Sequence, residues 1–126
     1  MNHTIIKSAN APAAIGPYSQ ATLHNGIMYV SGQIPLDPQN GELVSGTIEE
    51  ETHQVMKNLS AILQEAGMGF DNVLKCTIFV KDLSNFGAIN EVYGSYFKSN
   101  PPARETVEVS RLPKDVNVEI SCIAAL

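Results

Sequence analysis

The chain has 126 residues, enough for one domain over residues 1–126 that buries roughly two thirds of the surface its unfolded form exposes. Hydrophobic residues make up 44% and charged residues 17%, without a low-complexity tract, which excludes an intrinsically disordered protein. The net charge of −5, without a basic cluster, disfavours nucleic acid as a general partner because such binding depends on neutralising phosphates.

Residues 1–20 do not have the pattern of a targeting signal. Residues 1–20 lack the basic start and continuous apolar stretch of a signal peptide. No run of about eighteen apolar residues occurs anywhere in the chain. We therefore expect a cytoplasmic protein without a membrane partner, and we predict a short first strand at residues 4–7.

A tight hairpin is predicted at Asn25-Gly26, which stands between two β-prone runs. Both residues of such a turn must adopt positive φ, and asparagine and glycine tolerate this best. A two-residue turn fixes the register, so opposed residues share a face. The predicted core face carries Ala21, Leu23, Met28 and Val30, and the polar face carries Tyr18, Gln20, Ser31 and Gln33.

A helix and a strand are predicted after a loop rich in proline, asparagine and glycine. Thr47 and Glu50 form the capping-box pattern at the start of a helix that runs to about Ala66. Apolar residues at helical spacing give this helix a stripe that covers a sheet. The run NVLKCTIFVK then alternates as a strand does, with Leu74, Cys76, Ile78 and Val80 on the apolar face.

The C-terminal third is predicted to contain a second helix and two strands. The helix runs from about Ser84 to Lys98 and stops before two prolines. The strands lie near residues 104–110 and 116–124. Alternation directs one set of residues inward, namely Val107, Val109, Val116, Val118, Ile120, Cys122 and Ala124. It places Arg104, Thr106 and Glu119 on the opposite, polar side.

The order of elements predicts an α+β domain in which two helices cover one face of a mixed sheet. The uncovered face then carries aromatic, hydroxyl, amide and charged side chains. Its interspersed aromatic residues favour burial against other subunits over contact with solvent. The residues predicted on this face are Tyr18, Gln20, Ser31, Gln33, Thr77, Phe79, Arg104, Thr106 and Glu119.

Arginine and glutamate on this face suggest two complementary roles. Arg104 offers a planar fork of donors that matches a carboxylate, and Glu119 can position and deprotonate water. A cross-strand salt bridge between them is the alternative, and spacing alone favours it. Packing is likewise an alternative for Tyr18, and a β-bulge is one for Ser31-Gly32.

The remaining reactive side chains indicate neither a metal nor a cofactor. Cys76 and Cys122 have apolar neighbours, which predicts buried, reduced thiols. The three histidines are scattered and form no pair at metal-ligand spacing. The sequence also lacks the GxSxG, P-loop, GxGxxG and HExxH motifs.

Four ordered segments give the chain a family resemblance. They read APAAIGPYSQA at 11–21, SGQIPLDPQNGEL at 31–43, FVKDLSNFGAINEVYGSYF at 79–97 and PPARETVEVSRLPKDVNVEI at 101–120. Together they resemble the RidA family of reactive intermediate deaminases, once called YjgF-like, over nearly the whole length. The resemblance implies chorismate mutase-like subunits in a homotrimeric barrel, with a site in each cleft between subunits.

The resemblance also implies an activity in metabolite damage control. Members hydrolyse reactive 2-imino acids, such as 2-iminobutanoate and 2-iminopropanoate, and their enamines to 2-keto acids and ammonia, without a cofactor. By motif, Arg104 is similar to the clamp for the substrate carboxylate, Glu119 to the residue that holds the attacking water, and Tyr18 to the site tyrosine. Ser31 and Gly32 are expected to line the pocket and bind substrate. Asn90 resembles the interface asparagine near the site and is likewise expected to contact substrate.

One departure from the family pattern lies beside the predicted clamp. Many members have Ser-Cys where this chain has Glu105-Thr106. Alternation places Thr106 on the site face, where it is expected to contact substrate, and Glu105 on the other face. A second carboxylate beside Arg104 is nevertheless expected to compete for the guanidinium.

Two other functions are compatible with the resemblance. One is a non-enzymatic regulator or chaperone-like partner protein that binds a metabolite or another protein in the same clefts, which Glu105 favours. The other is an endoribonuclease that inhibits translation. The acidic charge and the lack of a histidine pair disfavour RNA cleavage.

Overall fold

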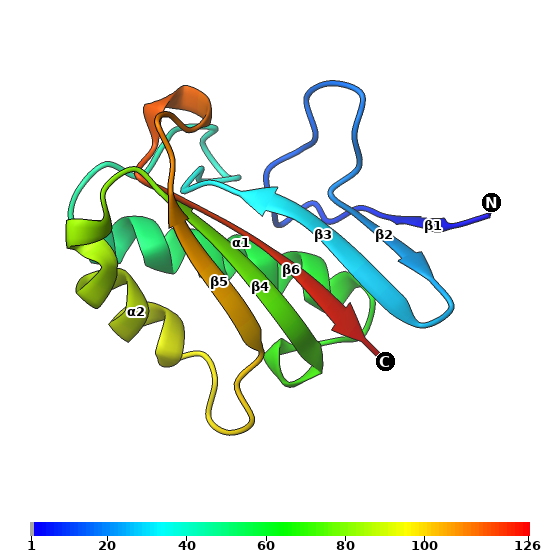
Figure 1. Cartoon of the computed structure of the whole chain (residues 1–126). Helices are drawn as coiled ribbons and strands as arrows, with labels where there is room; N and C mark the ends of the chain where they lie inside the picture. Colours follow the sequence, from blue (N-terminus) through cyan, green and yellow to red (C-terminus); the bar gives the residue numbers. More distant parts are fainter. Residues whose placement is uncertain (1) are drawn as a thin grey trace.

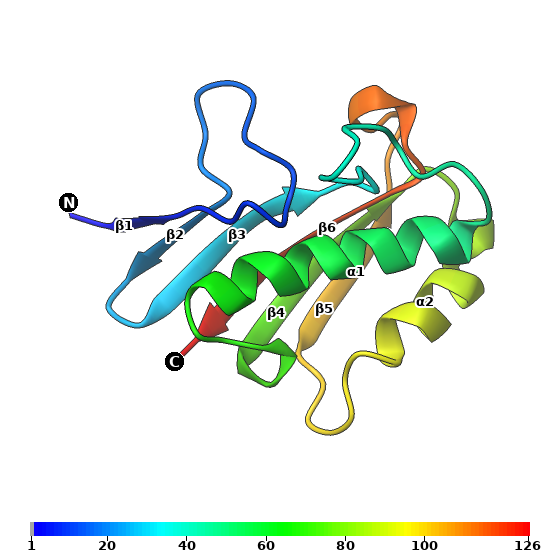
Figure 2. The ribbon, with the colours of Figure 1, turned by 180° about the vertical axis from the view of Figure 1, so that it is seen from behind.

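Six strands form one mixed sheet that two helices cover on one face (Figures 1 and 2). The computed structural model describes residues 2–126. Its strands are β1 (Thr4–Ile6), β2 (Ala21–His24), β3 (Ile27–Gln33), β4 (Val73–Val80), β5 (Ala103–Glu108) and β6 (Val118–Ala125), and its helices are α1 (Ile48–Glu65) and α2 (Phe86–Gly94). The order across the sheet is β1-β2-β3-β6-β4-β5, and β4 and β5 run parallel. The predicted α+β architecture is therefore confirmed.

The hairpin forms with the predicted turn and register. Asn25 and Gly26 adopt positive φ angles of 51° and 77°, which a tight primed turn requires. Leu23 lies opposite Met28, and Ala21 lies opposite Val30. Because Ala21, Met28 and Val30 are buried, the predicted core face of the hairpin is confirmed.

Helix α1 packs its apolar stripe onto the sheet and begins at the predicted cap. The Thr47 hydroxyl accepts a hydrogen bond from the Glu50 N–H at 3.1 Å, and the Glu50 carboxylate returns to the Thr47 backbone. Gly67, with a φ of 71°, follows the last turn. The helix residues that are fully buried in the core are Val55, Met56, Leu59, Ile62 and Leu63.

Helix α2 is shorter than predicted, because it ends at Gly94 rather than near Lys98. Glycine weakens a helix, and the Ser95 hydroxyl donates to the Val92 carbonyl at 2.6 Å just beyond the end. The aromatic residues that follow still pack inward without helical structure. Both contact Phe70: the centroid of the Phe70 ring lies 5.3 Å from that of Tyr96 and 5.4 Å from that of Phe97.

Two irregularities in the strands overturn predictions based on strict alternation. The register shifts between Val73 and Lys75, so Leu74 is 56% exposed instead of buried. A second shift, between Val30 and Gln33, turns Gln33 to the core face beside Ile120. An extra residue reverses the alternation beyond it. Gly32 is the sequence signal for the second shift, as the bulge alternative for Ser31-Gly32 predicted, whereas no comparable residue marks the shift at Leu74. Gln33 therefore does not share the polar face with Ser31.

The most important correction concerns strand β5, whose side chains point opposite to the prediction. Cys76 of β4 lies beside Arg104, and Ile78 lies beside Thr106. Neighbours in a sheet share a face, and Cys76 and Ile78 belong to the core under the helices. Arg104 and Thr106 therefore lie on the helix-covered face. Val107, predicted to face inward, is 41% exposed on the other side.

We call the surface of the sheet that faces away from α1 and α2 the open face. It mixes aliphatic, aromatic, polar and charged side chains, as predicted for a face that is not part of the core. Its residues are Tyr29, Lys75, Thr77, Phe79, Glu105, Val107, Glu119, Ser121 and Ile123. Within residues 2–126 neither helix combines the length and the apolar character that crossing a bilayer requires.

Candidate functional site

The predicted site residues fall into two groups on opposite faces of the sheet. Arg104 of β5 lies on the helix-covered face with Asn90 of α2, whereas Glu119 lies on the open face beside Phe79 and Gly32. One chain therefore does not bring Arg104 and Glu119 together. The alternative of a salt bridge between them is also excluded within the described chain, whose ion pairs are Lys75–Glu105 and Arg111–Asp115.

Arg104 is held against one side of helix α2. Its Nη1 donates a hydrogen bond of 2.6 Å to Asn90 Oδ1. Its guanidinium carbon lies 5.3 Å from the centroid of the Phe86 ring and 5.0 Å from that of Tyr93. Both distances are within the range of a cation–π contact. No carboxylate of residues 2–126 pairs with this cation, so its charge remains available to an anionic ligand.

An open cleft of about 440 Å³ lies directly beside the Arg104 guanidinium. Pro101 and Pro102, which precede β5, and Gly94, at the end of α2, form its other walls. Prolines have fixed φ angles and no N–H, so this wall is stiff and offers a ligand few competing donors. Among residues 2–126, the Arg104 guanidinium is therefore the one charged group that lines this cleft. Its lining residues are Asn90, Tyr93, Gly94, Pro101, Pro102 and Arg104.

Glu119 occupies the open face next to the β-bulge of strand β3. A Cβ atom on Gly32 would lie 2.6 Å from Glu119 Oε2 and 2.9 Å from its Cδ, so only glycine leaves room for the carboxylate in this position. Burial raises the pKa of Glu119 above its ordinary value. Such a carboxylate accepts a proton more readily than an exposed one, which suits a general base.

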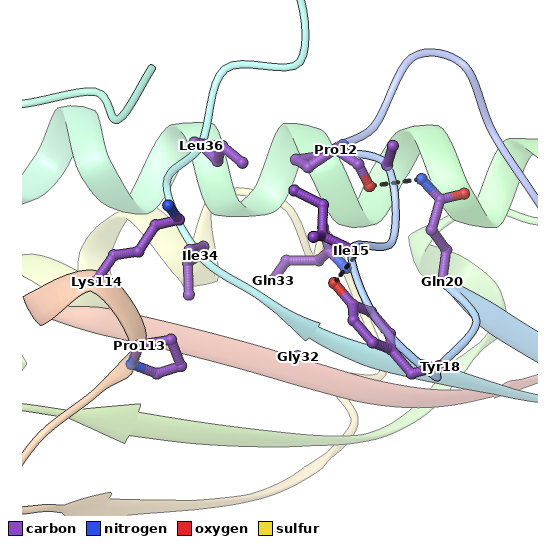
Figure 3. A pocket seen from close by; sticks show the side chains of 11 residues that line it. Pro12, Ile15, Tyr18, Gln20, Gly32, Gln33, Ile34, Leu36, Pro113 and Lys114 are labelled. Carbon is purple, nitrogen blue, oxygen red and sulfur yellow. Dashed lines mark hydrogen bonds between the residues drawn. The ribbon is translucent and has the colours of Figure 1, made fainter. Parts of the chain in front are cut away.

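Tyr18 and Gly32 line a second cleft, of about 300 Å³ (Figure 3). Tyr18 lies in the loop before β2, and its hydroxyl is 3.5 Å from the Ile15 backbone nitrogen. Aliphatic side chains, among them Ile34 and Leu36, cover much of the wall. Ser31 is next to Gly32 in the chain, but its hydroxyl donates to the Ser19 carbonyl at 2.7 Å and so stabilises the loop before β2. The bulge reading of Ser31-Gly32 and a site role for Gly32 are thus both compatible with the geometry.

Gln20 does not lie on an open polar face as predicted, because its side chain is buried. Its amide oxygen accepts from the Ser8 N–H at 2.6 Å. Its amide nitrogen donates to the Pro12 carbonyl at 2.7 Å, a bond that Figure 3 shows. The residue therefore fixes the segment before Tyr18 and shapes one end of the second cleft.

The structure removes the expected competition between Glu105 and Arg104. Glu105 lies on the open face, where it accepts a hydrogen bond from the Thr77 hydroxyl and pairs with Lys75 at 3.2 Å. The Thr77 hydrogen bond, and after it Lys75, lowers the pKa of Glu105. Thr106 does share the face of Arg104, but its hydroxyl is buried and has no hydrogen-bond partner among residues 2–126. It is not exposed to a ligand in this chain.

Sequence reasoning missed three residues around the clefts. The motifs did not single out Phe86 and Tyr93, although their positions relative to Asn90 on one helix face were a usable signal. Lys114 lines the second cleft from a turn in which both it and Asp115 adopt positive φ, 56° and 57°. Aspartate is enriched at positive φ but lysine is not, so the conformation of Lys114 could not be predicted from its residue type.

The two cysteines are reduced and buried, as predicted. Cys76 of β4 lies beside Cys122 of β6 on the core side of the sheet. Burial raises the pKa of Cys122 to about 12 and also raises the pKa of Cys76. A thiol that stays protonated is a poor nucleophile, so neither cysteine has a catalytic environment.

The chain is similar over nearly its whole length to known proteins. Residues 8–126 match the family described as Endoribonuclease L-PSP. The chain is 52% identical over 128 residues to a RutC family protein of Synechocystis, covering 100% of this chain and 98% of the relative. It is 49% identical over 120 residues to human 2-iminobutanoate/2-iminopropanoate deaminase, covering 95% and 88%. The crystal structure of E. coli TdcF with bound serine superposes with a TM-score of 0.93 at 40% identity, covering 98% of each chain.

Proposed function

Because the chain belongs to the Endoribonuclease L-PSP family, which includes the RidA, YjgF and RutC proteins, we propose that it hydrolyses reactive 2-imino acids. The products are a 2-keto acid and ammonia, and the substrates are of the 2-iminobutanoate and 2-iminopropanoate type together with their enamines. The observation that carries this proposal is the position of the Arg104 guanidinium. Helix α2 holds it beside a cleft, and it has no ion-pair partner among residues 2–126. The activity named for the human relative supports the choice of substrate.

Arg104 binds the carboxylate that every 2-imino acid carries. A guanidinium and a carboxylate form two parallel hydrogen bonds, which fix both the position and the plane of the acid. A hydrogen bond to a charged group contributes on the order of 1.5 to 3 kcal/mol. This single anchor is enough to orient a molecule of only a few heavy atoms.

Glu119 positions and deprotonates the water that attacks the imine. As the water oxygen bonds to C2 of the protonated imine, Glu119 accepts one water proton, and the C=N double bond becomes a single bond. The same carboxyl then gives the proton to the nitrogen, and the C–N bond breaks as the 2-keto group forms. The C2 hydroxyl proton passes to Glu119 and from there to the departing ammonia, which leaves as ammonium. Orientation supplies much of the acceleration, because a protonated imine is already a strong electrophile. None of these steps requires a cofactor.

The site takes Arg104 from one chain and Glu119 from another, because the two residues lie on opposite faces of a single sheet. Strand β5 is the edge of that sheet, so a second chain can approach Arg104 from the side. The mixed open face includes exposed apolar side chains for this contact, with Val107 41% and Tyr29 50% exposed. We place three such sites in the clefts of a homotrimer, where Tyr18 and Gly32 of the second chain line the cavity.

Ammonia release in a coupled reaction tests the proposed activity. A threonine dehydratase generates 2-iminobutanoate, and added wild-type protein is expected to accelerate the release of ammonia from it. Arg104→Ala removes the carboxylate anchor, so the acceleration is lost while the oligomer persists. Arg111→Ala is the matched control, since Arg111 is the chain's other arginine and forms an exposed pair with Asp115. An unchanged rate with wild-type protein refutes the proposal.

The two other functions draw no support from the clefts. Glu105, the residue that favoured a non-enzymatic regulator or chaperone-like role, points to the open face and away from Arg104. Among residues 2–126 no histidine lines either the Arg104 cleft or the Tyr18 cleft, so the histidine pair that would favour RNA cleavage does not occur there.

A further inference from the structure

Three residues at successive turns of α2 converge on the Arg104 guanidinium. Phe86, Asn90 and Tyr93 occupy positions i, i+4 and i+7, which lie on one side of a helix, and each contacts Arg104. We propose that this stripe, which we call the guanidinium cradle, positions Arg104 and sets the direction in which an acid is bound. The proposal rests on the carboxylate-binding role of Arg104 and adds positioning residues to it.

The contacts leave one part of the guanidinium free for a ligand. Asn90 Oδ1 accepts from Nη1 alone, so most of the five N–H groups of Arg104 remain without a partner among residues 2–126. The Phe86 and Tyr93 rings, at 5.3 and 5.0 Å, contact the guanidinium as cation–π partners and do not compete for its hydrogen-bond donors. The cradle therefore restrains Arg104 without neutralising it. An Asp or Glu side chain in their place would also restrain Arg104, but it would use the hydrogen-bond donors that a ligand needs.

The cradle is rigid because α2 is anchored in the core. Ile89, next to Asn90, is fully buried, and Val92 and Tyr93 are nearly so. The Tyr93 hydroxyl is buried and lacks a hydrogen-bond partner within the described chain, so its aromatic ring is the part that the arrangement uses. Asn90 consequently acts through Arg104 rather than on the substrate. This differs from the direct substrate contact that its motif implied.

Side-chain dynamics of the two arginines test the cradle without any ligand. The chain contains only Arg104 and Arg111, so their ¹⁵Nε signals are resolved and assigned with one substitution. Arg104 is expected to show a high order parameter and Arg111, in its exposed pair, a low one. Phe86→Leu and Tyr93→Leu should lower the Arg104 value, whereas Tyr93→Phe should leave it unchanged. Equal mobility of both arginines in the wild-type protein overturns the cradle.

Binding of 2-ketobutanoate, measured by calorimetry, tests what the cradle does for the site. Phe86→Leu keeps most of the side-chain volume but removes the ring, so the Kd should rise roughly three- to tenfold. KM should rise similarly with kcat largely retained. Tyr96→Phe is the control, because it removes a hydrogen bond to His53 and leaves the cradle intact. Its Kd should match that of the wild type, and melting curves confirm that each variant is folded.

The outcomes separate the cradle from the proposed reaction. A rigid Arg104 and a weakened Kd in Phe86→Leu support the cradle even if the wild-type protein releases no ammonia, in which case only the deaminase activity fails. An unaltered Kd in both Phe86→Leu and Tyr93→Leu overturns the cradle. Wild-type protein that binds no 2-ketobutanoate overturns the carboxylate grip, and with it the role assigned to the three helix residues.

Discussion

Mixing two inactive variants should restore activity if Arg104 and Glu119 act from different chains. Arg104→Ala abolishes the anchor, and Glu119→Gln abolishes the base, so each homo-oligomer alone is inactive. In a mixed oligomer, one site can combine Arg104 from the second variant with Glu119 from the first. The opposite placement of the two residues on the sheet makes this exchange necessary for a complete site.

The size of the recovery follows from counting site types. In an equimolar mixture with random assembly, half of the chains carry an intact Arg104 and the other half an intact Glu119. A site built from two neighbouring chains is complete when the first is of one type and the second is of the other. About one quarter of the sites in any cyclic oligomer then meet this condition, and activity should return to roughly 25% of the wild-type value.

The assay requires subunit exchange before the measurement. The two variants are unfolded together, refolded and assayed for ammonia release from dehydratase-generated 2-iminobutanoate. Variants refolded separately and mixed afterwards provide the control, and they should remain inactive if exchange is slow. Lack of recovery in co-refolded oligomers that contain both chains by mass spectrometry would refute the two-chain site. It would place both residues in one chain, against the sheet register.

Four further outcomes are expected. Gly32→Ala should leave the melting temperature nearly unchanged yet lower kcat about a hundredfold, because its methyl group displaces the flexible Glu119 carboxylate; an unaffected kcat would contradict this. Burial raises the folded pKa of Glu119, so the native state binds more protons between the unfolded and folded pKa values, and stability falls as pH rises through that window. Glu119→Gln should therefore melt higher than wild type at pH 7 but not at pH 4, and equal melting at pH 7 would be inconsistent with a desolvated carboxylate. Val107→Asp should yield monomers in sedimentation, whereas Leu83→Asp, an equally exposed position off the open face, should not. Thr47→Ala should cost about 1 kcal/mol in chemical denaturation, and a loss near zero would show that the cap of α1 is dispensable.

Local chemistry made several elements predictable from the sequence. Asn25-Gly26 determined the hairpin and its register because few residue pairs tolerate two successive positive φ angles. Thr47 and Glu50 marked the first turn of α1 because each satisfies a backbone donor that the helix leaves free. These signals act over two to four residues, so no knowledge of the tertiary structure was needed.

The faces of the site residues depended on contacts that lie far apart in the sequence. The pairing of β5 with β4 determines which side chains of β5 face the helices. The valines of β5 did not predict this face correctly, because Val107 lies on the open face. Gly32 marked a possible bulge before Gln33, but only the pairing of β3 with β6 shows that the bulge forms and turns Gln33 to the core face. The motifs identified Arg104 and Glu119, but only the register showed that a single chain keeps them apart.

The β4–α2–β5 segment, residues 73–108, contains Arg104 together with every residue that contacts its guanidinium. The proposed carboxylate-binding group is thus encoded in one continuous stretch of chain, whereas Glu119, Gly32 and Tyr18 are supplied by the rest of the fold. On this proposal, substitutions around Arg104 can accumulate without disturbing the residues proposed to activate water. Related proteins could for this reason diversify the reaction, or lose it, while still recognising small organic acids.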